Sequence, residues 1–466
     1  MQLGISKSVS KKQKESALIM RKQTKIAAVV SAAALLALGA SMTSFAASKG
    51  TWMMVDGEWY CYDKNGDAYT NVFCSSNGKE YYVGDDGQLV RSEWVDYDGS
   101  YYFVNSSGAK ITNDWRLTTP YDDDSADEDE YWYYLKKATG KPATGKQSNI
   151  NGQIYLFNEE GQMQVGWVAR SDSSTKNFVQ LDKEDEEQDM ILLSEYADSE
   201  VYYCGDEDDG HAKKNKWLKT WLPSDTEEEE DDKEWFWFDK NGKLYRASGS
   251  DATVKAQKYK LEEGDLIYDG DSITGVEKKK VNSKDYWFRP DGVMLAKFYM
   301  IDDNMYYFGG SDDGSMKTGS QTVKDNTGDS YKFYFYTKDQ DKTKYTTPEE
   351  GNQLKKGAGV VGNQSNKLYY YGLLLTADDY KYQVAKVGGY EFIINSNGSI
   401  QHSYSATYKE DGDELVVVGD QIKYDKNGNY VSGTAEYVAD GQYKYGFKSG
   451  ITNKVSDVDV SQFYKK

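Results

Sequence analysis

The chain has 466 residues, rich in Tyr (41), Trp (11) and Gly (43) but with only 2 His and 5 Pro. Its formal net charge is −20 at pH 7, and the first 46 residues carry seven Lys or Arg against one Glu, so the remainder is more acidic still. Such a charge repels nucleic acids and anionic lipid surfaces, which excludes nucleic acid as a partner. Abundant aromatics and glycines favour short strands and turns over helices.

The N-terminal residues 1–46 predict an export signal, with Met20 as an alternative start. Basic residues from Arg21 to Lys25 precede an apolar run, Ile26 to Gly39, and Ser44-Phe45-Ala46 supplies the small residues of a cleavage site. The alternative is a membrane anchor, for which the apolar run is short. We therefore expect a cleaved signal helix, no stable membrane insertion afterwards, and a secreted protein at the cell surface.

A glycine frame repeats along the chain. Gly57, Gly78 and Gly99 are spaced by 21 residues, as are Gly66, Gly87 and Gly108, and each pair encloses an aromatic segment such as GEWYCYDKNG. The same Gly-x8-Gly frame returns at Gly152–Gly161, Gly389–Gly398, Gly419–Gly428 and Gly441–Gly450. Self-similarity at a fixed period is typical of architectures in which each repeat packs on its neighbours.

Each frame predicts a β-hairpin. Its aromatic residues form the first strand, and Asp-Lys-Asn-Gly, which occurs at Asp63–Gly66, Asp239–Gly242 and Asp425–Gly428, forms a tight turn. Two residues beyond the second Gly, an apolar residue recurs on the returning strand: Leu89, Met163, Leu244, Met294, Met316 and Ile400, with Ala68 and Lys110 as exceptions. One hairpin buries too little surface to stand alone. We therefore expect an all-β fold of tandem hairpins stacked as a β-solenoid.

Three segments carry a resemblance to a known family. Gly57–Cys61, Gly161–Trp167 and Gly314–Gly319 resemble the cell wall-binding repeat, which is the choline-binding and glucan-binding repeat of Gram-positive surface proteins. The resemblance covers most of residues 50–319, and a more decayed form covers 385–450. It implies stacked hairpins that bind choline on cell-wall teichoic acid, or glucan, between adjacent repeats.

The aromatic residues of the best repeats are the candidate ligand-binding residues. Ring faces attract a quaternary ammonium by about 0.5–2 kcal/mol per contact, and sugar rings stack on the same faces. On the resemblance, the candidates are Trp52, Trp59, Tyr60, Tyr81, Tyr82, Trp94, Tyr101, Tyr102, Trp115 and Trp167. The competing interpretation makes these rings core residues. Cys61 stands where related repeats carry a third aromatic, which weakens one wall of a cage.

Three acidic segments interrupt the repeats, at Asp122–Glu130, Asp182–Asp189 and Asp225–Glu234. Solvated loops are the simpler interpretation, and weak Ca²⁺ binding is the alternative. The sequence from Asp63 begins like an EF-hand loop, but its twelfth residue is Cys74 where a Glu is required. We therefore expect no metal site and no cofactor.

Motifs for catalysis are missing from the sequence. His211 and His402 are the only histidines, too few for a zinc-dependent wall amidase, and neither lies in a nucleophile motif. Cys61 and Cys204 stand at strand positions, and a Cys61–Cys74 disulfide is left open. The longest stretches without clear hairpins are shorter than an ordinary catalytic domain.

The predicted organisation is a signal peptide over 1–46, N-terminal repeats over 47–170, interrupted repeats over 171–319 and degenerate β repeats over 320–466. We expect a non-catalytic, carbohydrate-binding surface protein that attaches to cell-wall glycopolymer. One alternative is a cell-wall hydrolase or glycosidase with a divergent catalytic segment within 320–466. Another is an adhesin for host glycans.

Overall fold

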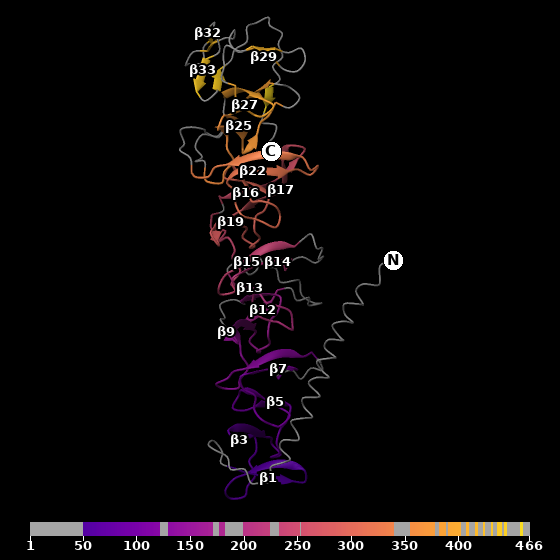
Figure 1. Cartoon of the computed structure of the whole chain (residues 1–466). Helices are drawn as coiled ribbons and strands as arrows, with labels where there is room; N and C mark the ends of the chain where they lie inside the picture. The colour runs from indigo at the N-terminus through magenta and orange to yellow at the C-terminus, as the bar shows by residue number, and fades with distance from the viewer. Residues whose placement is uncertain are drawn as a thin grey trace, which may run out of the picture. The chain divides into compact units, whose positions relative to one another are not determined.

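The computed structural model describes residues 50–121, 129–170, 177–181, 199–223, 233–251, 253–339, 355–377, 382–387 and 390–401, together with short strands between Thr407 and Asp459. The described residues form strands and no helix (Figure 1), which confirms the all-β prediction. In this part of the chain there is accordingly no helix that could cross a membrane. The predicted signal segment, His402 and most of the three acidic segments lie outside the described residues.

The chain divides into two compact units, the first containing the described residues up to Lys213 and the second those from Lys214 onwards. The strands of the first unit are β1 (Thr51–Val55), β2 (Glu58–Tyr62), β3 (Val72–Ser76), β4 (Lys79–Val83), β5 (Glu93–Asp96), β6 (Tyr101–Val104), β7 (Asp114–Thr118), β8 (Tyr131–Leu135), β9 (Gly145–Ile150), β10 (Gln153–Phe157), β11 (Trp167–Arg170), β12 (Phe178–Gln180) and β13 (Val201–Tyr203).

The strands of the second unit are β14 (Lys216–Thr220), β15 (Glu234–Phe238), β16 (Lys255–Glu262), β17 (Asp265–Thr274), β18 (Glu277–Val281), β19 (Lys284–Phe288), β20 (Phe298–Ile301), β21 (Asn304–Tyr307), β22 (Gly319–Lys324), β23 (Ser330–Phe335), β24 (Gly362–Gln364), β25 (Lys367–Tyr370), β26 (Leu373–Leu374), β27 (Tyr382–Val387), β28 (Tyr390–Asn395), β29 (Thr407–Lys409), β30 (Leu415–Val417), β31 (Lys423–Tyr424), β32 (Tyr430–Val431), β33 (Glu436–Ala439), β34 (Gln442–Lys444) and β35 (Asp457–Asp459).

The hairpin of the first repeat turns at the first glycine of the frame. β1 pairs antiparallel with β2 up to Val55↔Glu58, so Asp56 and Gly57 form a two-residue loop. Both have positive φ, 50° and 92°, as a type I′ turn requires. The prediction that the aromatic segment is the first strand was therefore wrong. It is the second strand, because the Asp-Gly pair before it already supplies the tightest hairpin loop.

The Asp-Lys-Asn-Gly segment forms the next turn, as predicted. The Asp63 carboxylate accepts hydrogen bonds from the backbone N–H groups of Asn65 (2.8 Å) and Asp67 (2.9 Å), and Gly66 has a φ of 89°. Beyond this turn the chain pairs back only through a single bridge, Tyr62↔Ala68. The expected returning strand is thus reduced to one paired residue.

A recurring backbone hydrogen bond joins many of the repeats to the preceding one. The N–H two residues beyond the second frame glycine donates to a backbone oxygen in, or directly before, the second strand of the preceding hairpin. In the β7–β8 repeat this position is Pro142, which has no N–H to donate. In the first unit these bonds are Leu89 to Trp59 (2.9 Å), Lys110 to Glu80 (2.8 Å), Met163 to Trp132 (2.9 Å) and Ala212 to Ile154 (2.8 Å). In the second unit they are Met294 to Trp235 (2.9 Å), Met316 to Asp285 (2.8 Å), Gly359 to Met305 (2.7 Å) and Ile400 to Asn366 (3.0 Å). Side chains take no part in these bonds.

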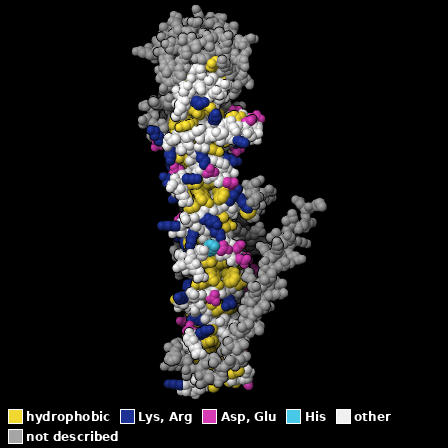
Figure 2. Space-filling view, viewed as in Figure 1, with side chains coloured by type: hydrophobic (Ala, Val, Ile, Leu, Met, Phe, Trp, Pro, Cys, Tyr) yellow, Lys and Arg dark blue, Asp and Glu magenta, His cyan; other side chains and the backbone are white. Residues whose placement is uncertain are grey.

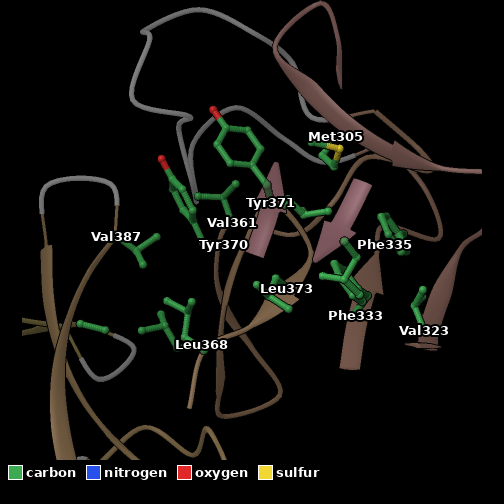
Figure 3. Close-up of a cluster of buried hydrophobic side chains, with 14 of the residues drawn as sticks. Met305, Val323, Phe333, Phe335, Val361, Leu368, Tyr370, Tyr371, Leu373 and Val387 are labelled. Carbon is green, nitrogen blue, oxygen red and sulfur yellow. The ribbon is translucent and has the colours of Figure 1, made fainter. Parts of the chain in front are cut away.

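The second unit contains a core built from several repeats. Figure 3 shows Phe333 and Phe335, which lie two residues apart on β23 and therefore on the same face of the strand. Their ring centroids are 6.1 Å apart. They are buried together with Met305 from β21 and Leu373 from β26. β22 to β26 form one five-stranded sheet around this cluster, in the order β22-β23-β26-β25-β24. The apolar positions of this region therefore serve packing between repeats.

Candidate ligand-binding site

Aromatic rings from two adjacent repeats meet at Trp115. Trp115 on β7 is paired with Tyr134 on β8, and their ring centroids are 5.1 Å apart at an angle of 58°. Tyr155, on β10 of the next repeat, lies 4.8 Å from Trp115 at 64°. Phe157 lies buried beneath, 5.9 Å from the Trp115 ring. The rings of Trp115, Tyr134 and Tyr155, here called the Trp115 site, are all half-buried, so each keeps part of its surface open to solvent.

The surroundings of the Trp115 site include a carboxylate. Asp209 contacts His211 and accepts a hydrogen bond from Lys213 at 2.7 Å. Burial alone would raise the pKa of Asp209, but the hydrogen bonds from Lys213 and His211 hold it below its usual value. Burial, and secondarily the Asp209 charge, raise the pKa of Tyr155, whose ring lies 6.4 Å from His211. Figure 2 shows hydrophobic side chains gathered beside histidine and acidic side chains on this face.

We call the contact between the aromatic rings of two adjacent repeats a junction. The junction between the first two repeats has the same arrangement as the Trp115 site, but one of the three rings is missing. Trp52 lies 5.7 Å from Tyr81 of the next repeat, but its partner on the neighbouring strand is Cys61, which corresponds to Tyr134. Trp52 itself is 6% exposed, and Trp59 packs against the same cluster. Cys61 and Cys74 are both buried and free. A hydrogen bond from Cys74 lowers the pKa of Cys61.

The second junction has a cation of the chain itself above its rings. Phe73 corresponds to Trp115, and its centroid lies 5.1 Å from Tyr82 and 5.4 Å from Tyr102. All three rings are buried. The Lys110 ammonium lies 5.0 Å from the Phe73 centroid and 4.7 Å from that of Tyr102.

The third junction is filled by another segment of the chain. Trp94 lies 5.3 Å from Phe103 and 5.0 Å from Tyr133, as the common plan requires. Tyr121 lies 5.2 Å from Trp94 and stacks on Tyr101 at 4.1 Å. The indole Nε1 of Trp94 donates to the backbone oxygen of Thr119, the residue two before Tyr121, at 3.0 Å. The chain thus covers the rings of this junction.

The ten predicted residues are therefore distributed over several junctions. Trp52 meets Tyr81, Tyr82 and Tyr102 share Phe73, and Trp94 and Tyr101 share Tyr121. Tyr60 lies near Tyr62, and Trp167 is 2% exposed beside Tyr203. Their role as ligand contacts stays a prediction.

Sequence reasoning missed two rings of the Trp115 site. Tyr155 occupies the same frame position as Tyr81 and Tyr102, three residues after the first glycine, so the frame carried a signal for it. Tyr134 follows an acidic segment that interrupts the frame, and no spacing identified it.

The second unit repeats the arrangement at Trp217. Its ring lies 5.2 Å from Trp237 on the paired strand and 4.8 Å from Tyr286 of the next repeat. Phe288 stacks beneath at 5.8 Å and 10°, as Phe157 does at Trp115. Trp217 is half-buried, whereas Trp237 and Tyr286 are buried. Across the described residues, no group of three or more His, Cys, Asp or Glu side chains is arranged to hold a metal ion.

No protein-family model matches this sequence, and no curated protein matches it. Among solved structures, the chain is similar to the modular autolysin LytC from Streptococcus pneumoniae in complex with a synthetic peptidoglycan ligand. The two share 18% identity with a TM-score of 0.34, over 72% of this chain and 54% of LytC, so the chain spans about half of LytC. The choline-binding domain of CbpL from the same organism shares 20% identity, with a TM-score of 0.31, over 58% of this chain and 98% of its own. The choline-binding domain of Spr1274, also from S. pneumoniae, shares 32% identity with a TM-score of 0.13, over 14% of this chain and 84% of its own.

Proposed function

The chain resembles choline-binding repeat proteins, and we propose that it is a non-catalytic secreted protein that attaches to the cell wall by binding choline groups of teichoic acid. Its repeats would stack as a β-solenoid, and the Trp115 site would hold the ligand. The observation that carries the proposal is the convergence of Trp115, Tyr134 and Tyr155, three rings from two repeats that all remain partly open to solvent.

The geometry favours a quaternary ammonium over a sugar. Tyr134 and Tyr155 are tilted by 58° and 64° to Trp115, so the three rings surround a rounded group instead of forming a flat platform. A quaternary ammonium is round, and its charge is attracted to ring faces by about 0.5–2 kcal/mol per contact. Met163, half-buried in the same cluster, adds a polarisable thioether. Choline is therefore the preferred ligand, and glucan is the second choice.

The Trp217 arrangement supplies a second, more enclosed candidate site. Its rings have nearly the same separations as those at Trp115. Because Trp237 and Tyr286 are buried, less ring surface is accessible, and we expect weaker binding there.

A non-catalytic role is supported by the hydrogen bonds and strand pairing of the described residues beyond 320. Gly359 and Ile400 donate the same inter-repeat hydrogen bond as Leu89 in the first unit. Between them, β24 and β25 form an antiparallel hairpin, as do β27 and β28. This use of the chain favours a binding protein over a hydrolase with a catalytic segment in 320–466.

The test is sedimentation of the mature chain, residues 47–466, with purified choline-containing cell walls, with and without excess choline. We expect cosedimentation that choline releases. Trp115→Ala removes one ring face and should weaken choline binding about 5- to 30-fold, which corresponds to about 1–2 kcal/mol. The matched control is Tyr268→Ala, which removes an exposed ring outside these junctions and should bind like the wild type.

Two outcomes would contradict the proposal. Wall binding that resists choline but is released by soluble glucan would assign a sugar ligand. Clearing of purified walls in a zymogram by the mature chain would establish a hydrolase.

A further inference from the structure

Lys110 occupies an unusual place for a lysine. It stands two residues beyond the second glycine of its frame, where other repeats have Leu89, Met163 or Met294. Its side chain is only 12% exposed, and its ammonium makes a 2.6 Å ion pair with Glu80. An ammonium is costly to bury unless it is paired. Here the partners are one carboxylate and two ring faces.

The rings below this ammonium correspond to those of the Trp115 site. Phe73 takes the position of Trp115, Tyr82 that of Tyr134, and Tyr102 that of Tyr155. The Lys110 ammonium is 5.0 Å and 4.7 Å from the centroids of Phe73 and Tyr102, within the roughly 6 Å at which a ring face attracts a cation. At this junction a cation of the chain therefore already lies on the aromatic surface.

A second lysine shows the same behaviour at another junction. Lys146 stands at the strand position that corresponds to Trp115, since it pairs with Leu156 as Trp115 pairs with Tyr134. Its ammonium lies 4.6 Å from the Tyr202 centroid and donates to the Tyr202 hydroxyl at 2.9 Å. In the first unit, a lysine thus contacts ring surface at two junctions other than the Trp115 site.

We propose that Lys110 is an internal ligand of the Phe73 junction: its ammonium fills a cation site that would otherwise take an alkylammonium or quaternary ammonium ion from solution. This proposal rests on the proposed function in one respect, that such junctions bind organic cations. The wild-type Phe73 junction is consequently closed to ligand, and Lys110 limits the number of sites in the first unit.

Shortening Lys110 should convert the closed junction into a binding site. Lys110→Ala leaves Phe73, Tyr82 and Tyr102 in place and frees the Glu80 carboxylate. Glu80 is 43% exposed, so a cation from solution can reach it. The vacated space is then bounded by the rings of Phe73 and Tyr102 and by a negative charge, which together select an organic cation over a neutral molecule.

The experiment measures binding of tetramethylammonium chloride to the mature chain by calorimetry, together with the thermal midpoint of unfolding. Lys110→Ala should bind one equivalent more than the wild type. Its midpoint should be lower than that of the wild type and should rise with tetramethylammonium but not with sodium chloride at equal ionic strength. The matched control is Lys141→Ala, which removes an exposed lysine bonded to Ser100 and should change neither quantity.

Further variants separate this proposal from the proposed function. In a Trp115→Ala, Trp217→Ala background, the wild-type sites are removed, and the added equivalent in Lys110→Ala should persist. If Lys110→Ala does not fold, Lys110→Met supplies the residue that Met163 provides at the Trp115 site and should show the same gain. A folded variant that binds no additional equivalent and is not stabilised by tetramethylammonium would overturn the internal-ligand proposal. Absence of choline binding by the wild type would overturn only the proposed function.

Discussion

Gly108 lies so close to Leu89 of the preceding repeat that no side chain fits between them. A Cβ at Gly108 would be 2.6 Å from Cδ1 of Leu89, and the φ of Gly108 is +78°. Two independent restrictions therefore require glycine here, one from the backbone conformation and one from the neighbouring repeat. Gly210 has the same relation to Met163, at 2.3 Å from its sulfur.

Gly108→Ala should accordingly be more destabilising than an alanine at another left-handed glycine. The positive φ costs about 1–2 kcal/mol, and the contact with Leu89 adds about 1–3 kcal/mol of overpacking. Gly99→Ala is the matched control, because its φ is +64° but its Cβ would meet nothing within 4 Å. Denaturant unfolding measures both. Adding Leu89→Ala to Gly108→Ala should recover part of the loss, and strict additivity would contradict the contact.

The Asp63 turn should make stability depend on pH. Hydrogen bonds from the backbone of Asp67, and then of Asn65 and Gly66, lower the pKa of Asp63 despite some desolvation. Because the folded-state pKa is depressed, the stabilisation is present above the unfolded value, about 3.9, and is lost as pH falls through the folded value. Asp63→Ala should be less stable than the wild type at pH 7, and the difference should shrink at strongly acidic pH, where only the hydrogen bonds to the neutral carboxyl group remain.

Asp63→Asn is the matched control, since its side-chain oxygen accepts the same hydrogen bonds without a charge. It should remove most of the pH dependence while retaining much of the stability at pH 7. An unchanged pH profile in this variant would show that the Asp63 charge does not contribute.

Tyr155→Phe should change stability only at alkaline pH. Burial, followed by the Asp209 charge, raises the pKa of Tyr155. A raised folded-state pKa means that stability is fully present below the unfolded value, about 10, and is lost as pH rises through the folded value. The variant should therefore lose less stability than the wild type as the pH rises above about 10. Because the ring remains, choline binding at pH 7 should be unchanged.

The three thiols should be protected in the folded protein. Cys61, Cys74 and Cys204 are each 0% exposed, and burial raises the pKa of Cys204. A thiol reagent such as dithiobis-nitrobenzoate should therefore react with none of them at pH 8 in native buffer and with all three in denaturant. Only one reactive thiol in denaturant would indicate that Cys61 and Cys74 form a disulfide in the isolated protein.

Much of the local structure followed from the sequence, because glycine and aspartate impose it locally. The frame from Gly57 to Gly66 marked two real turns, and the residue two positions beyond the frame marked the contact between repeats. The prediction that the aromatic segment is the first strand of the hairpin was wrong because it overlooked the Asp56-Gly57 turn directly before it. Whether Asp56-Gly57 forms the hairpin loop depends on which two strands pair, and pairing is a tertiary property.

The candidate site was only partly predictable. Trp59 and Tyr60 are adjacent in sequence, but neighbours on a strand point to opposite faces and do not share a site. The rings that do meet, Trp115 and Tyr155, are separated by an acidic segment and two strands, β8 and β9. That Lys110 covers one junction and Tyr121 another depends on contacts between repeats, which no periodicity in a single sequence encodes.

The hydrogen bond from Leu89 to Trp59 and its counterparts in other repeats connect peptide groups alone. Neighbouring repeats can therefore stay attached whatever ring, thiol or lysine stands at the junction between them. The junctions of such a chain can evolve independently. One substitution can create a binding site at a junction and another can remove one, while the backbone hydrogen bonds between repeats are kept. The number of open junctions then becomes an adjustable property, set by separate substitutions and independent of the length of the protein.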